Sequence, residues 1–376
     1  MSEARPTRLE ELVGEAQRVL AICNACRYCE GYCAVFPALE RRLAFDEGDV
    51  HYLANLCHNC GACFQACQYA PPHEFALNFP RVLSQVRKET YKKYAWPGFL
   101  AAAFEAEGAA SGVVVAIALT AILAFMSIWA EPGTLGNAYS DAEGSFYAVL
   151  PHAAMAGLFG AVFALALVAI VAGVASFWAD GGEGLAGAKP MGEATWDAAS
   201  LRYLDGGGAG CTAPDARRAG MRRAFHQFAF LGFMLCFAAT CVATIYHYVF
   251  AIRAPYPFWS LPVLLGTIGG LGMAAGSAGL LWLRRWRDPL LADETQSAMD
   301  TSFLLLLFAV AATGLALLAL RETRAMGALL AVHLGFVLAL FVTLPYGKFM
   351  HAPYRFAALV RYHLERRRPL PSIGSE

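Results

Sequence analysis

Eight of the eleven cysteines in this chain lie close together near its beginning, in two runs with the same spacing. In each run three cysteines are separated by two residues, and a fourth follows after three more. Thiolates in this pattern are typical ligands of [4Fe-4S] clusters, in which the fourth cysteine of one run binds the cluster of the other. The sequence therefore predicts two clusters, one bound by Cys23, Cys26, Cys29 and Cys67, and the other by Cys33, Cys57, Cys60 and Cys63.

Zinc is the alternative metal for a cysteine-rich segment. A structural zinc site is usually built from two separated pairs of ligands, whereas here an unbroken run of four cysteines occurs twice. The usual cluster motif has proline directly after the fourth cysteine, but Ala34 and Gln68 occupy these positions. We still expect iron-sulfur clusters, because the spacing of the ligands is intact. The 23 residues between the runs favour a helical ferredoxin domain over a compact type with strands.

Four histidines lie in or at the ends of strongly apolar segments. His226 and His247 are 21 residues apart, and His333 and His351 are 18 residues apart, so each pair is expected on one face of a single helix. In antiparallel helices His226 would lie level with His351, and His247 with His333. Since an unpaired imidazole in lipid is costly, this arrangement predicts one or two b-type haems with two histidine ligands each. His152 is the expected substitute for His247 or His333, and hydrogen-bonded packing is the alternative for each histidine.

The composition favours a membrane protein. Hydrophobic residues make up 58% of the chain and charged residues only 15%, outside the usual balance of a soluble domain. The formal net charge is zero, so no overall basic field exists that would attract nucleic acid. We therefore expect the lipid bilayer as a partner and no nucleic acid.

Long apolar stretches alternate with polar ones from about residue 110 onward. Each is long enough to cross a hydrocarbon core of about 30 Å. The six predicted spans are residues 111–130, 149–178, 228–251, 261–283, 302–320 and 325–344. The predicted organisation is a helical ferredoxin domain with two clusters in residues 1–95, a six-span domain with haem b in 96–352, and a basic cytoplasmic tail in 353–376. Residues 82–99 are expected in the headgroup layer or in a solvated connecting helix.

The basic residues predict the orientation of the spans. Lysine and arginine gather before the first span and after the second, fourth and sixth, and such segments usually face the cytoplasm. Residues 1–17 lack the apolar core of a secretory signal. We therefore expect a multi-pass protein of a bacterial inner membrane, with both termini, the cluster domain and the 179–224 loop in the cytoplasm.

Four stretches of the chain resemble the tricarballylate/citrate utilisation protein B family. They are Cys23 to Pro37, Cys57 to Cys63, Leu201 to Cys211 and Leu344 to His351. The resemblance implies electron transfer from a separate flavin-containing dehydrogenase for tricarballylate or a similar tricarboxylate, through two [4Fe-4S] clusters and haem b, to membrane quinone. It also implies a mainly α fold, similar to a helical ferredoxin subunit of the heterodisulfide reductase type joined to a membrane subunit like the nitrate reductase gamma chain.

No arrangement of catalytic residues for substrate conversion is evident, so we expect flavoprotein:quinone oxidoreductase activity only together with a partner. Two other classes of function stay open. One is a membrane redox sensor without electron flux. The other is a transporter regulated by an iron-sulfur domain, which the absence of acidic residues from the predicted spans disfavours.

Overall fold

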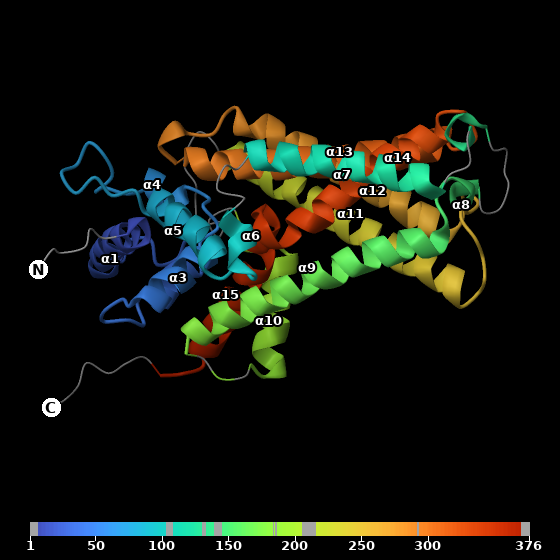
Figure 1. Ribbon diagram of the computed structural model, residues 1–376. Helices are drawn as coiled ribbons and strands as arrows, with labels where there is room; N and C mark the ends of the chain where they lie inside the picture. Colours follow the sequence, from blue (N-terminus) through green and yellow to red (C-terminus); the bar gives the residue numbers. More distant parts are fainter. Residues whose placement is uncertain are drawn as a thin grey trace, which may run out of the picture.

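The computed structural model contains a bundle of long helices with a smaller group of helices packed at one end (Figure 1). It describes residues 7–102, 108–129, 133–138, 145–182, 184, 186–204, 216–291 and 293–369. Every regular element in these ranges is a helix, which confirms the predicted mainly α fold and the absence of strands from the described part of the cysteine-rich domain.

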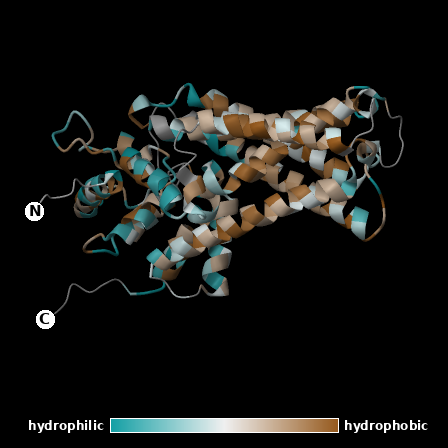
Figure 2. Ribbon diagram, in the orientation of Figure 1, coloured by the Kyte–Doolittle hydropathy of each residue, from teal (hydrophilic) through white to brown (hydrophobic). Residues whose placement is uncertain are grey.

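Six of the described helices are long and apolar enough to cross a membrane, which confirms the predicted number of spans. They are α7 (Gly108–Trp129), α9 (His152–Asp180), α11 (Ala216–Tyr248), α12 (Leu261–Arg284), α13 (Glu294–Leu320) and α14 (Met326–Thr343). Apolar residues dominate this bundle, and polar residues gather at its two ends (Figure 2). Shorter elements connect the long helices: α6 (Gly98–Ala102), η1 (Thr134–Gly136), α8 (Ser145–Val149), α10 (Ala188–Ala199), η3 (Pro289–Leu291), η4 (Leu344–Tyr346) and η5 (Lys348–Met350).

Helices α11 and α12 pack very closely because glycines face the neighbouring backbone. A Cβ atom added at Gly232 would lie 2.4 Å from the backbone nitrogen of Met273, and one at Gly276 would lie 2.3 Å from that of Ala229. Between apolar helices in lipid, such close van der Waals packing replaces the hydrophobic driving force that operates in water. Helix α11, which carries two of the predicted histidines, is thereby held against α12.

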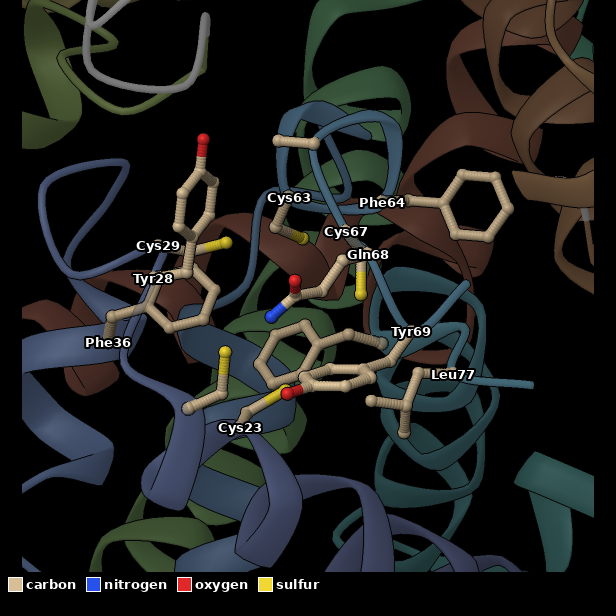
Figure 3. Close-up of a pocket in the computed structure, with 13 residues that line it drawn as sticks. Cys23, Tyr28, Cys29, Phe36, Cys63, Phe64, Cys67, Gln68, Tyr69 and Leu77 are labelled. Atoms are coloured by element: carbon tan, nitrogen blue, oxygen red, sulfur yellow. The ribbon is translucent and has the colours of Figure 1, made fainter. Parts of the chain in front are cut away.

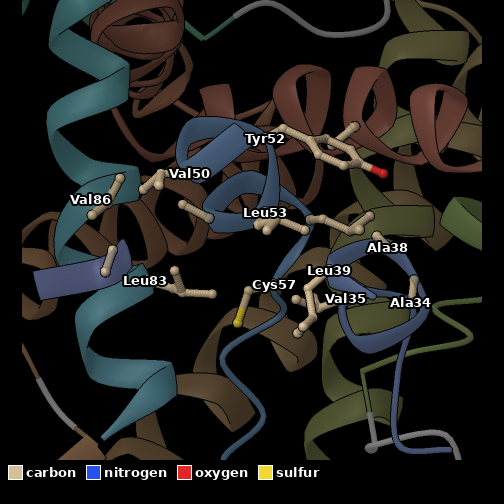
Figure 4. Close-up of a cluster of buried hydrophobic side chains, with 14 of the residues drawn as sticks. Ala34, Val35, Ala38, Leu39, Val50, Tyr52, Leu53, Cys57, Leu83 and Val86 are labelled. Atoms are coloured by element: carbon tan, nitrogen blue, oxygen red, sulfur yellow. The ribbon is translucent and has the colours of Figure 1, made fainter. Parts of the chain in front are cut away.

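The cysteine-rich end is built from α1 (Arg8–Cys26), α2 (Val35–Leu39), α3 (Glu47–Leu56), α4 (Ala62–Gln65) and α5 (Phe79–Lys93). Helix α1 begins with a capping box, in which Thr7 and Glu10 satisfy each other's free backbone N–H groups. Its apolar residues recur at helical spacing, and Val13, Ala16 and Leu20 are buried. The second cysteine run begins in the same core, where Cys57 lies among aliphatic side chains (Figure 4).

Helix α5 differs from the expectation of a headgroup-level or solvated helix. Val82, Leu83 and Val86 are buried in the core of the cysteine-rich end, and α5 packs against α1 and α3. Its apolar residues recur every three to four positions, so one face of the helix is buried even though the segment is rich in basic residues. Helix α5 is therefore a core element of this end of the molecule.

The C-terminal segment also differs from the expected basic tail. Residues 351–365 form α15 (His351–Glu365), in which Tyr354, Ala358 and Leu359 are buried. This helix packs against α3, α9 and α10, so it joins the cysteine-rich end to the bundle (Figure 1). Residues 370–376 of the predicted tail lie outside the described residues.

A network of largely buried ion pairs attaches α15 to the cysteine-rich end. Arg42 contacts Asp49 at 2.6 Å, and Arg361 contacts Asp49 at 3.1 Å and Glu365 at 2.9 Å. Arg42 also pairs with Glu365, and both guanidinium groups lie over the ring of Tyr52. Because these charges are buried, removal of one partner leaves another charge without compensation.

Glu365→Ala is expected to destabilise the protein by about 3 kcal/mol, since two buried arginines would then share one carboxylate. The measurement is thermal unfolding of the detergent-solubilised chain, followed by circular dichroism. Glu15→Ala is the control, because Glu15 pairs with Arg18 on the surface, where an ion pair contributes less than about 1 kcal/mol. Equal effects of the two substitutions would contradict a structural role for the network.

Candidate redox centres

Two cavities at the cysteine-rich end are lined by the two cysteine runs. The larger cavity, of about 200 Å³, is lined by Cys23, Cys26, Cys29, Cys63 and Cys67 together with aromatic residues such as Tyr28 and Tyr69. Figure 3 shows that Cys23, Cys29, Cys63 and Cys67 surround one shared space. The smaller cavity is lined by Cys33, Cys57, Cys60 and Cys63. Each cavity thus combines cysteines of both runs, as the crossed assignment requires, and this assignment stays a prediction.

Local backbone geometry explains how each run curves around its cavity. Helix α1 ends at Arg27, whose left-handed conformation turns the chain directly after Cys26. In the second run Gly61 has a φ of +86°, and a Cβ atom there would lie 2.6 Å from Cδ1 of Leu291. A side chain at position 61 would therefore be strained and would collide with its neighbour.

The cysteine sulfurs suit a multinuclear cluster better than a single ion. Among the described residues, no group of three or more His, Cys, Asp or Glu side chains is close enough to bind one metal ion. A cubane tolerates wider spacing, because each thiolate binds a different iron. Burial, and then the neighbouring Cys67, raise the pKa of the Cys23 thiol to about 12. Ionised thiolates at this position therefore require a strong positive partner such as iron.

His226 and His351 face each other at the end of the bundle next to the cysteine-rich helices. Their ring centroids are 6.1 Å apart and the ring planes are at 86°. Two metal-imidazole bonds of about 2 Å, placed in line, separate ring centroids by about 6 Å. At this spacing His226 and His351 could together hold one iron-containing group.

Each ring of the pair has a nitrogen that is free to bind a further group. Nδ1 of His351 lies 2.5 Å from the carbonyl oxygen of Lys348, so Nδ1–H donates to that oxygen and Nε2 is left without a proton. Metal-binding histidines commonly have this arrangement, since the backbone oxygen orients the ring. Nδ1 of His226 is buried and has no hydrogen-bond partner. An unsatisfied ring in a buried position fits a site that holds a further group.

The expectation that His333 and His351 share one helix is wrong. Helix α14 ends at Thr343, and the turn through Pro345 and the extended Gly347 starts a new helix at His351. Proline and an extended glycine interrupt the hydrogen-bonded ladder that the count of five turns assumed. His226 and His351 are nevertheless neighbours, because the turn keeps His351 at the same end of the bundle.

The structure does not bring His247 to His333. His247 stacks on His152, with ring centroids 3.5 Å apart and planes at 16°, and Tyr147 lies against both rings. Nδ1 of His333 instead lies 3.1 Å from the hydroxyl of Thr313 on α13. Stacked rings lack the separation of about 6 Å that an iron between them needs. Nδ1 of His247 is nevertheless buried and unsatisfied, as Nδ1 of His226 is, and the contact with Thr313 leaves Nε2 of His333 free. Haem ligation by His247 and His333 therefore stays a prediction.

Two arginines connect the second cysteine run to the helices that carry the histidine pair. Nη2 of Arg355 donates to the carbonyl oxygen of Cys57 at 2.9 Å, and Nη1 of Arg222 donates to that of Asn59 at 3.5 Å. Burial, and then the charge of Arg355, lower the pKa of His58 well below its usual value, so this ring is neutral.

The sequence did not lead us to predict that Arg222 and Arg355 lie beside the histidine pair, although their spacing from the histidines indicates it. Arg222 lies four residues before His226, and Arg355 lies four residues after His351. Residues four apart lie on the same face of a helix. Each arginine could therefore have been assigned to the face of its helix that carries the histidine.

Cys33→Ser is expected to disturb the cluster of the smaller cavity and to preserve the other, because Cys33 lines only the smaller of the two cavities described here. Electron paramagnetic resonance of the reduced protein would distinguish the two clusters. Cys67→Ser is the matched variant and should have the opposite effect. If Cys33→Ser removed only the cluster of Cys23, Cys26 and Cys29, the crossed assignment would be wrong.

Two family models match this chain. Residues 16–93 match the family model "Citrate utilization protein B Fer4-like domain", and residues 106–372 match the model "Citrate utilization protein B". The chain is 52% identical to the citrate utilization protein B of Escherichia coli over 364 residues, which cover 96% of this chain and 94% of that protein. No solved structure shows significant similarity, so the likeness to the nitrate reductase gamma chain stays a prediction.

Proposed function

The chain belongs to the citrate utilization protein B family, and we propose that it carries electrons from a flavin-dependent dehydrogenase to membrane quinone. Its Fer4-like domain and its six apolar helices indicate an iron-sulfur electron-transfer protein associated with a membrane. Beyond this, we propose that the donor is a flavoprotein, that the acceptor is quinone, and that the chain binds two [4Fe-4S] clusters and one haem b. The observation that carries the proposal is the histidine pair at ligating distance beside the second cysteine run.

We propose that the electron donor docks next to the larger cavity. Tyr28, which lines this cavity, is 67% exposed, and Cys26 and Cys29 are only half-buried. Electron transfer between proteins requires a close approach of the two redox groups, which an exposed edge allows. A flavoprotein that oxidises a tricarboxylate would dock over this edge.

The smaller cavity would receive electrons next, because it lies closer to the histidine pair. Cys57 is buried, and Arg355 links its carbonyl group to the helix that begins with His351. His58 lies between Cys57 and Asn59, and His226 is among the groups whose charge lowers the pKa of His58, after burial and Arg355. The redox sites therefore follow one another from the exposed cavity to the buried cavity and then to the histidine pair.

His226 and His351 would hold a b-type haem through Nε2 of His351 and a ring nitrogen of His226. When bound, haem would supply a one-electron carrier at the boundary between the protein core and the lipid. The residues present orient one ring through Lys348 and leave the other ring without a competing hydrogen bond. The apolar helices around the pair would exclude water, and their lipid-facing surfaces would give access to quinone.

His226→Ala or His351→Ala is expected to remove a low-spin b-type absorbance that quinol reduces in the unsubstituted chain, because each variant lacks one axial ligand. The iron-sulfur absorbance should persist, since the cysteines lie outside the bundle. His73→Ala is the control, because His73 lies at the cysteine-rich end among Tyr69 and Phe75 and should not affect this signal. Full haem content in both ligand variants would exclude the pair, and a haem that does not respond to quinol would favour a redox sensor.

We also propose that the cysteine-rich end faces the cytoplasm of a bacterial cell, because basic residues gather in the segments on its side of the predicted spans. Gly136→Cys, at the exposed opposite end, should react with an impermeant thiol reagent in intact cells. Leu43→Cys, on the cysteine-rich end, should react only after lysis, since Leu43 is 74% exposed. The unsubstituted chain measures background from native cysteines, and the reverse labelling pattern would overturn the orientation.

A further inference from the structure

Positively charged side chains gather beside His226 and His351. The charges of Arg222, Lys348 and Arg355 act on His226, and Arg87 and Arg287 lie near these three side chains. We call the five side chains the cation cluster. Arg222 precedes His226 on α11 by about one turn, and Arg355 follows His351 on α15 by about one turn. Since both arginines also contact the second cysteine run, the cluster lies on the side of the histidine pair that faces that run.

The cation cluster has little negative charge near it. Nζ of Lys348 lies 2.6 Å from Oδ1 of Asp300, and Asp300 also pairs with Arg284 at 3.2 Å. Within the described residues, the four arginines of the cluster make no ion pair with a carboxylate. They donate instead to backbone oxygens, as Arg87 does to Ala54 and Arg355 to Cys57. Carbonyl oxygens satisfy hydrogen bonds but do not neutralise a charge.

Several donors of the cation cluster are also unsatisfied. Arg87 is 3% exposed, and its Nη2 atom has no hydrogen-bond partner, nor do the Nε atoms of Arg222 and Arg355. The charge of Arg87 also acts on Arg355, so two buried guanidinium groups repel each other here. Buried charges that repel one another destabilise a fold unless an anion compensates them. The arrangement is that of an anion site.

We infer that the cation cluster binds the two propionate carboxylates of the haem that we assign to His226 and His351, an inference that rests on the proposed function. The free N–H groups of Arg87 and Arg355 can each pair with a carboxylate oxygen, and a guanidinium group matches a carboxylate with two parallel hydrogen bonds. Two carboxylates would add negative charge to that of Asp300 and of the thiolates in the second cysteine run. They would also orient the haem with its polar edge toward the second cysteine run.

The test compares haem with its dimethyl ester, in which both carboxylates are blocked. The full-length chain, produced without haem in a haem-deficient host and kept in detergent, is titrated with each compound, and absorbance measures binding. The ester should bind at least about tenfold more weakly, since it cannot form charged hydrogen bonds with the arginines. This comparison uses the unsubstituted chain, so it does not depend on the folding of any variant.

Arg87→Gln should weaken haem binding by about tenfold and leave binding of the ester nearly unchanged, because only haem presents carboxylates to Arg87. Arg87→Lys should retain part of the preference for haem. Arg285→Gln is the matched control. Arg285 directly follows the last residue of α12, is exposed, and is not a member of the cation cluster. If Arg87→Gln only damaged the structure, it would weaken the binding of haem and of the ester equally.

Three results would overturn the inference. Equal affinities of the unsubstituted chain for haem and ester would exclude propionate binding and leave the proposed function intact. Binding of free citrate to the haem-loaded chain, abolished by Arg87→Gln, would show that the cation cluster takes a free carboxylate instead. Failure of the unsubstituted chain to bind haem at all would overturn the proposed function, and the inference with it.

Discussion

The hydrogen bond from Arg355 to the carbonyl oxygen of Cys57 holds together the two halves of this molecule that matter for electron transfer. It joins the loop of the second cysteine run to the helix that begins with His351. One turn of helix separates Arg355 from His351, so the distance between the smaller cavity and the histidine pair depends on this contact. A relay needs such a fixed distance, because electron transfer becomes steeply slower as redox groups move apart.

Helix α15 can maintain this contact because its far end is also attached. The buried network of Arg42, Asp49, Arg361 and Glu365 joins it to the cysteine-rich helices, and His363 contacts Asp197 of α10 at 2.9 Å. Buried ion pairs contribute little net stability after desolvation, but they penalise any arrangement that leaves one partner unpaired. We therefore attribute to them the specific position of α15 more than the overall stability of the fold.

The two ends of the bundle differ in what they could bind. At the cysteine-rich end, His226 and His351 are 6.1 Å apart and lie beside unpaired arginines. At the opposite end, His152 and His247 are stacked at 3.5 Å among tyrosine rings. The contrast supports our proposal of one haem, bound at the cysteine-rich end of the bundle.

The sequence by itself determined the features that depend on near neighbours in the chain. Cysteine spacing predicted the cluster ligands, hydropathy identified six apolar helices, and apolar periodicity identified the buried face of α1, since each property is encoded within one element. Only the tertiary structure decided that His247 meets His152, that residues 351–365 form a buried helix, and that Arg87 approaches Arg355. These contacts depend on the turn at Pro345 and Gly347 and on the packing of helices far apart in sequence, which no local pattern encodes.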